Sequence, residues 1–139
     1  MFLGIPVLEG RTERQSLNGG REPMNAQQGY LEHGTAAERW DRGLLFFEAK
    51  EYANAALVLD GVAAEAPELL APRLLLARAY YHSAQLSRAE RELRAILERW
   101  PVEDYAQLML GRTLERQGRA AEAAPHLRIA AAMAGDFPE

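Results

Sequence analysis

Apolar residues recur at intervals of three and four along the chain after Thr35, which is the spacing of one buried face of an α-helix. Two such helical stretches run into a proline: VAAEAPELL reaches Pro67 and ILERWPVED reaches Pro101, 34 residues later. Proline lacks the N–H that a helix interior requires, so each of these prolines marks the end of a helix. The pattern therefore predicts an array of helices interrupted at a regular interval.

The interval defines a repeat. Three blocks of 34 residues that start at Ala36, Leu70 and Asp104 align without gaps. Small residues let two helices approach closely, and large apolar residues form the stripe that one helix buries against the next. Each block therefore predicts an antiparallel helical hairpin. The matching columns are Gly43, Ala77 and Gly111; Phe46, Tyr80 and Leu114; Ala55, Ala89 and Ala123; Leu59, Leu93 and Leu127; Val62, Ile96 and Ala130; and the terminal Pro67, Pro101 and Gly135.

The hairpin turns are predicted near residues 49–51, 84–85 and 117–118. At the start of the array, Thr35 followed by Glu38 is the spacing of a capping box, so the first helix is expected to begin there. Pro125 lies near the start of the last helix, where proline is tolerated only within the first turn. We therefore expect that helix to start late or to bend.

Residues 1–35 contain six glycines and little apolar periodicity, which predicts a flexible arm ahead of the repeats at 36–69, 70–103 and 104–137. The apolar run FLGIPVL is too short for a signal peptide or a membrane span. It is free to fold back onto the repeats or onto a neighbour. Whether residues 1–23 are native, or whether Met24 is the true start, stays open.

Composition restricts the function. A net charge of -4 gives no general attraction to nucleic acid or to anionic membranes. The absence of cysteine excludes disulfides and thiolate chemistry and favours the cytoplasm. Lys50 is the single lysine among 16 basic residues, and this preference for arginine, together with abundant alanine, is typical of a GC-rich bacterial genome.

No catalytic motif is present. The sequence has no glycine-rich phosphate loop and no HExxH, and its three histidines, His33, His82 and His126, lie in different blocks without supporting carboxylates. We expect neither an enzyme nor a bound metal or cofactor.

The 34-residue hairpin with small residues at fixed positions and a closing proline resembles the tetratricopeptide repeat. The resemblance covers residues 36 to about 137 and implies an all-α fold, an α-solenoid of three stacked hairpins that curves into a right-handed arc. The sequence departs from the family at Arg42, where leucine is usual. Aromatic residues are common in the family at the positions occupied here by Arg39, Arg73 and Gln107.

The family resemblance further implies that the first helix of each hairpin lines a concave groove. We expect this groove to bind an extended or helical protein segment with an apolar anchor and acidic groups. It lacks the lysine and asparagine set with which some family members bind the C-terminal carboxylate of chaperones. In the alternative interpretation, the aromatic residues only fill the hairpin packing and the arginines are solvated. The candidate groove residues are Trp40, Leu44, Phe47, Arg78, Tyr81, His82, Tyr105, Arg112 and Arg116.

The last helix supports a different hypothesis. No capping helix is expected after Ala134, so the apolar side of the third repeat would be partly open to water, which makes it a candidate self-association (homodimer) or partner surface. Alternatively, its many alanines keep the exposed area small enough to be tolerated. The candidate self-association residues are Leu127, Ile129, Ala130 and Met133.

Overall fold

The computed structural model describes residues 33–135, which form helices connected by turns and contain no strand. The helices are α2 (Ala36–Glu48), α3 (Tyr52–Glu65), α4 (Leu70–His82), α5 (Leu86–Arg99), α6 (Asp104–Arg116) and α7 (Ala120–Met133). The predicted all-α fold is confirmed. The arm predicted for residues 1–35 lies outside the described residues except for His33, Gly34 and Thr35, and so do the run FLGIPVL, Met24 and the last two residues of the third repeat.

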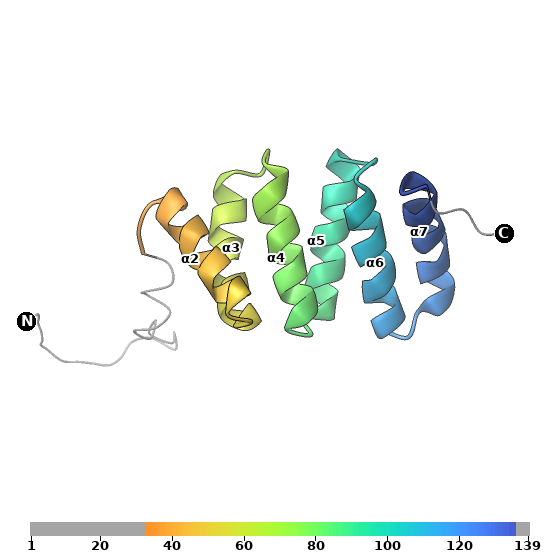
Figure 1. The fold of residues 1–139 in the computed structure, drawn as a ribbon, viewed down its shortest axis with the longest axis horizontal. Helices are drawn as coiled ribbons and strands as arrows, with labels where there is room; N and C mark the ends of the chain where they lie inside the picture. Colours follow the sequence, from red (N-terminus) through yellow and green to blue (C-terminus); the bar gives the residue numbers. More distant parts are fainter. Residues whose placement is uncertain (1–32, 136–139) are drawn as a thin grey trace, which may run out of the picture. The chain divides into compact units, whose positions relative to one another are not determined.

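Each helix packs against the one that precedes it and the one that follows it, so the three predicted hairpins are α2–α3, α4–α5 and α6–α7. Figure 1 shows these helices following one another in a row from α2 to α7. Helix α4 also contacts α6, which brings first helices of neighbouring hairpins together. This arrangement confirms the predicted solenoid of stacked hairpins.

The three hairpin turns share one backbone geometry. Lys50, Ala84 and Gly118 each have a positive φ, of 62°, 62° and 78°. In each turn the amide of the next residue donates a hydrogen bond back to the carbonyl five residues earlier: Glu51 to Phe46, Gln85 to Tyr80 and Arg119 to Leu114, at 2.8 to 2.9 Å. A left-handed residue with this hydrogen bond is a common helix end. Each first helix therefore ends at the same point of its repeat, as the sequence predicted.

The repeated columns form the core. Ala55 and Leu59 are fully enclosed in the cluster of the first two hairpins. The cluster of the second and third hairpins encloses Ala77, Leu93, Ile96, Leu114 and Ala123. Glycine permits the closest helix approach, because a Cβ atom on Gly43 would lie 2.7 Å from Cδ2 of Leu59. The core therefore follows the alternation of small and large residues seen in the sequence.

The start of α2 agrees with the prediction, and the start of α7 does not. Thr35 accepts a hydrogen bond from the Glu38 amide at 3.1 Å, and its own amide donates to Glu38 Oε1 at 2.8 Å. Of the two alternatives predicted for the last helix, the late start is wrong, because α7 begins at Ala120 and contains Pro125, and the bend stays a prediction. One missing backbone donor is tolerated there because Ala123 and Ala130 are buried where α7 packs against α6.

None of the helices in residues 33–135 is long and apolar enough to cross a membrane.

Candidate partner-binding surface

The first helices of the three hairpins meet at Arg78. Its guanidinium carbon lies 4.8 Å from the centre of the Phe47 ring on α2 and 5.6 Å from the centre of the Tyr105 ring on α6. Both distances are within the range of cation–π attraction. Three of the predicted groove residues, one from each first helix, therefore lie together with Arg78 in the middle. We call Phe47, Arg78 and Tyr105 the Arg78 site.

Next to this site, four rings gather at the ends of α2 and α4. His82 stacks on Tyr52 with centroids 4.6 Å apart, and the Phe47 ring meets Tyr52 edge-on at 5.2 Å. His82 also lies edge-on to Phe47 and to Tyr81. Tyr52 was not among the predicted groove residues, because it is the first residue of a second helix, α3. An aromatic residue directly after the turn was its only sequence signal.

Arg116 ties α6 to the end of α4. Its Nη1 atom donates a hydrogen bond to the carbonyl of Tyr81 at 2.8 Å, and its guanidinium lies 4.6 Å from the centre of the Tyr81 ring. Arg112, one helical turn earlier on α6, instead forms an ion pair with Glu115 at 3.1 Å. The two predicted arginines of α6 therefore differ: Arg116 adjoins the aromatic cluster, whereas Arg112 already has a carboxylate partner.

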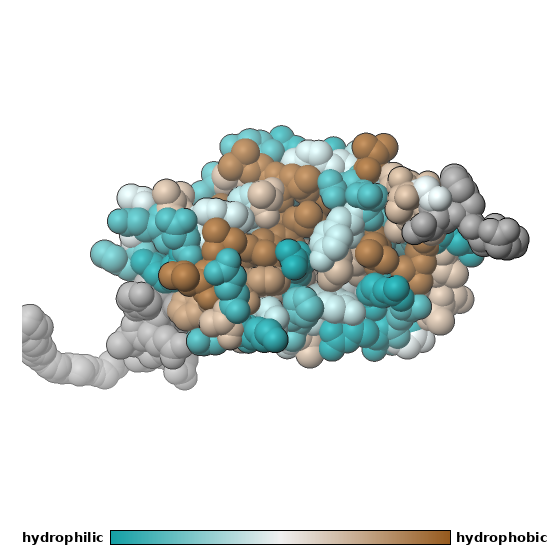
Figure 2. All heavy atoms as spheres, in the orientation of Figure 1, coloured by the Kyte–Doolittle hydropathy of each residue, from teal (hydrophilic) through white to brown (hydrophobic). Residues whose placement is uncertain are grey.

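Trp40 and Leu44, the remaining α2 candidates, are half-buried and pack against the core cluster that contains Leu59 and Leu76. Tyr81 and Tyr105 pack in the same half-buried way against the second cluster. These side chains are therefore held in place by the core while part of each remains exposed. Figure 2 shows hydrophobic residues gathered over the centre of the array and hydrophilic residues over α2.

The surface around His82 is positively charged. The pKa of His82 is lowered, first by burial and then by the positive charges of Arg78 and Arg116. His82 is therefore neutral at physiological pH. No group of three or more histidines or acidic residues in the described part of the chain is arranged to hold a metal ion.

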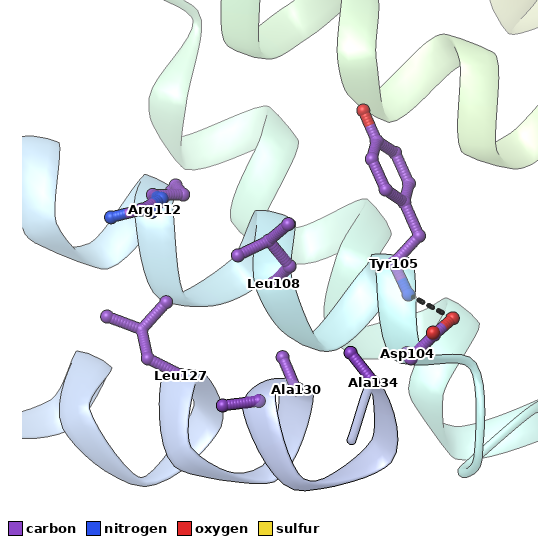
Figure 3. Close-up of a pocket in the computed structure, with 8 residues that line it drawn as sticks. Asp104, Tyr105, Leu108, Arg112, Leu127, Ala130 and Ala134 are labelled. Carbon is purple, nitrogen blue, oxygen red and sulfur yellow. Dashed lines mark hydrogen bonds between the residues drawn. The ribbon is translucent and has the colours of Figure 1, made fainter. Parts of the chain in front are cut away.

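A hollow of about 480 Å³ lies between α6 and α7. Figure 3 shows Leu108 on α6 facing Leu127 and Ala130 on α7, while the Tyr105 ring points away from α7. Of the four self-association candidates, Leu127 and Ala130 line this hollow, and Ala130 is only 7% exposed. Ile129 and Met133 are more exposed, at 42% and 38%. Met133 follows Ala130 by three residues and shares its helix face, whereas Ile129 points about 200° away from Leu127.

Comparison with known proteins agrees with the repeat and the fold. Residues 46–110 match the tetratricopeptide repeat family. The structure of a MamA mutant superposes with a TM-score of 0.68 at 22% identity, over 77% of this chain and 80% of that one. The structure MamA MSR-1 C2 gives 0.65 at 23% identity, over 72% of this chain and 56% of that one, and a different MamA mutant gives 0.66 at 23%, over 74% and 55%. No curated protein matches the chain.

These identities are low, so the solved structures establish the fold alone, and this chain spans little more than half the length of the latter two. The hairpins and their stacking define an α-helical repeat domain of a class that serves as protein-interaction modules. Residues 46–110, a little under half of the chain, match the tetratricopeptide repeat family, and the 34-residue period of that family continues on both sides of the matched segment.

Proposed function

We propose that the chain is a non-catalytic adaptor that holds a segment of a partner protein against the first helices α2, α4 and α6. The observation that carries this proposal is the meeting of Phe47, Arg78 and Tyr105, one residue from each first helix. Aromatic and arginine side chains are the residue types that most often dominate protein interfaces.

The mechanism is preorganisation. Trp40 and Phe47 are held by the core, and Arg116 is fixed by its hydrogen bond to the Tyr81 carbonyl. Side chains that are already ordered lose little freedom when the partner arrives, so more of the contact energy appears as affinity. The surface therefore binds without folding around its partner.

The partner is a protein or peptide in the bacterial cytoplasm, with an apolar group near Trp40 and Phe47 and acidic groups near Arg78 and Arg112. The net charge of -4 disfavours nucleic acid. These partner groups match the surface, which has aromatic residues on α2 and arginines on α4 and α6.

The test is an affinity purification from the source cell with the wild type and with the double variant Arg78→Ala, Arg112→Ala. The matched control is Arg91→Ala, Arg128→Ala, which removes two exposed arginines of the second helices α5 and α7. Circular dichroism verifies folding. A protein retained by the wild type and the control but lost by the double variant supports the proposal. Equal recovery by all three baits contradicts it.

Self-association through the α6–α7 hollow is a second candidate function. Its support is that Leu127 and Ala130 line this hollow, whereas their counterparts Leu59, Leu93, Val62 and Ile96 are buried between successive hairpins. Light scattering across a range of concentrations tests it with Ala131→Arg, which places a charge in the lining of the hollow. A dimer that becomes a monomer in this variant supports the second function, and a wild-type monomer contradicts it.

A further inference from the structure

Three arginines of residues 33–135 that are partly or fully withdrawn from water have carboxylate partners, namely Arg39, Arg73 and Arg119. Half-buried Arg42 donates a hydrogen bond to the carbonyl of His33. Arg39 is buried, and its Nη2 atom lies 2.7 Å from Glu65 Oε2. Arg73 is half-buried, and its Nε atom lies 3.1 Å from Glu92 Oε2. Removing a charge from water is costly unless an opposite charge compensates, so these pairs are what stability requires.

Arg78 departs from this rule. It is half-buried, its Nε atom is shielded from water, and that atom has no hydrogen-bond partner among residues 33–135. No described carboxylate forms an ion pair with it. The rings of Phe47 and Tyr105 attract its charge, but they accept no hydrogen bond in the plane of the guanidinium, which is where its donors point.

The groups around Arg78 leave its charge uncompensated. Arg116 adds a second cation near His82, and both arginines lower the pKa of His82 after the effect of burial. The other rings that contact His82 are those of Phe47, Tyr52 and Tyr81, which bring no negative charge to the site. A cation kept in such a place lowers stability, and proteins keep costly groups of this kind at functional sites.

We propose that Arg78 is the docking point for one carboxylate of the partner segment. The carboxylate accepts hydrogen bonds from the two Nη groups of Arg78, and the apolar part of the partner residue packs beside the rings of Phe47 and Tyr105. Arg112 is a weaker docking point for a carboxylate than Arg78, because its exposed side chain already has a partner in Glu115 at 3.1 Å. The carboxylate belongs to an aspartate or glutamate side chain or to a chain terminus. This inference rests on the proposed function and identifies the chemical group that the surface selects.

The probe is a library of acetylated and amidated hexapeptides that combine apolar and acidic residues, with glutamine and asparagine counterparts. Binding is measured to the full chain, to Arg78→Met and to Arg112→Met. We expect the wild type to bind acidic members with an affinity about tenfold or more above that for their amide counterparts, because a charge-assisted hydrogen bond is stronger than a neutral one. Arg78→Met should lose this preference and still bind apolar members, and Arg112→Met should keep it.

The outcomes separate the two proposals. If the wild type prefers neither acidic side chains nor a free C-terminus, or if Arg78→Met keeps the preference, the carboxylate inference is overturned and the adaptor function stands. If the wild type binds no member, both are overturned. The same peptides with a free C-terminus distinguish the two sources of the carboxylate, because a terminal carboxylate then restores binding to members without acidic side chains.

Thermal unfolding provides a second test that needs no ligand. Methionine retains much of the arginine stem without the charge, so Arg78→Met should leave the Tm unchanged or raise it. Arg73→Met should lower the Tm, since Glu92 is then left half-buried without its partner. A fall for Arg78→Met as large as that for Arg73→Met would show that Arg78 serves the fold, and it would overturn the inference.

Discussion

The first and third repeats end the array in different ways. On α4 and α6, the face turned to the preceding hairpin is buried and almost wholly apolar, whereas the equivalent positions of α2 carry two charges and a leucine that is 67% exposed. The positions that correspond are Glu38, Asp41 and Leu45 in α2; Pro72, Leu75 and Ala79 in α4; and Ala106, Met109 and Thr113 in α6. The first repeat is therefore closed by polar residues, while the third keeps the apolar hollow between α6 and α7.

The difference shows that a repeated position is apolar where a preceding hairpin buries it and polar where it is exposed, whatever residue type is usual at that position of the repeat. Arg42 illustrates the point: it stands where the family usually has leucine, and at the first helix it donates a hydrogen bond to the carbonyl of His33. Its counterparts Leu76 and Leu110 are buried. Substitutions at matched positions of the first and third repeats should consequently differ in cost.

The largest difference is expected at the two close-approach glycines. In Gly43→Ala, the new Cβ would lie 2.7 Å from Cδ2 of Leu59, which is fully enclosed and cannot move aside. Overpacking costs about 1–3 kcal/mol, and we expect a loss near 2 kcal/mol in urea unfolding.

Gly111→Ala tests the other end. The Cβ would come still closer to Leu127, but this side chain lines the α6–α7 hollow and has space to rotate into it. Since alanine also favours the helix over glycine by about 1 kcal/mol, the net change should stay within about 1 kcal/mol. A larger loss at Gly111 than at Gly43 would show that the hollow gives Leu127 no freedom.

The second difference concerns the ion pairs that join helices. Glu90 on α5, whose side chain is 16% exposed, accepts hydrogen bonds from Arg94 at 3.0 Å and from Arg119, just before α7, at 2.8 Å. Glu65, the partner of Arg39 in the first repeat, is 55% exposed. Glu90→Gln should therefore cost about 1–2 kcal/mol. Glu65→Gln should cost less, because Glu65 is exposed and the buried Arg39 keeps its hydrogen bond to the carbonyl of Gly34 at 3.2 Å. Equal losses in urea unfolding would contradict this distinction.

The Glu90 network also predicts a dependence on pH. Burial raises the pKa of Glu90, but the hydrogen bonds from Arg119 and Arg94 outweigh it, so the pKa lies below the ordinary 4.5. A lowered carboxyl pKa stabilises the fold at pH values above the ordinary one, and that contribution disappears as the pH falls through the lowered value. The Tm difference between wild type and Glu90→Gln should therefore shrink below about pH 4.5. A difference that is constant from pH 7 to 3 would exclude the network as its cause.

The helices, the turns and the capping box could be predicted because they depend on local spacing. The 34-residue period established the equivalence of Lys50, Ala84 and Gly118, although just one of them is glycine. The extent of α7 could not be predicted in this way, because the burial of Ala123 and Ala130 overrides the local cost of Pro125.

The site was less predictable, because its contacts join residues far apart in the chain. The first-helix positions were found from the repeat, but the stacking of His82 on Tyr52 depends on the packing of α4 beside α3. The contacts made by Arg39, Arg73 and Gln107, which stand where the family commonly has aromatic residues, could not be predicted from the sequence either. Arg39 and Arg73 pair with glutamates, and Gln107 Oε1 lies 2.9 Å from Nδ1 of His126, so each departure contacts the second helix of its own hairpin.

A third comparison uses the hairpin turns. Lys50 has a φ of 62° in the first turn, and Gly118 has a φ of 78° in the third. A side chain in this conformation costs about 1 kcal/mol relative to glycine, so Lys50→Gly should stabilise the protein and Gly118→Ala should destabilise it by about that amount. No atom lies within 4 Å of a Cβ added at Gly118, so the loss there is purely conformational. Urea unfolding measures both, and a stabilising Gly118→Ala would contradict the shared turn geometry.

The smallest difference is expected at the helix starts. Thr35 caps α2 through the hydrogen bond from the Glu38 amide, whereas the residue before α7, Arg119, makes no side-chain cap. Thr35→Ala should cost about 0.5–1 kcal/mol, and the loss should be local because α2 packs mainly against one helix of the described chain, α3. Hydrogen exchange should therefore accelerate at the first amides of α2 while those of α7 keep their rates. Acceleration in both helices would mean that the cap of the first repeat supports the whole array, and the two ends would not be independent.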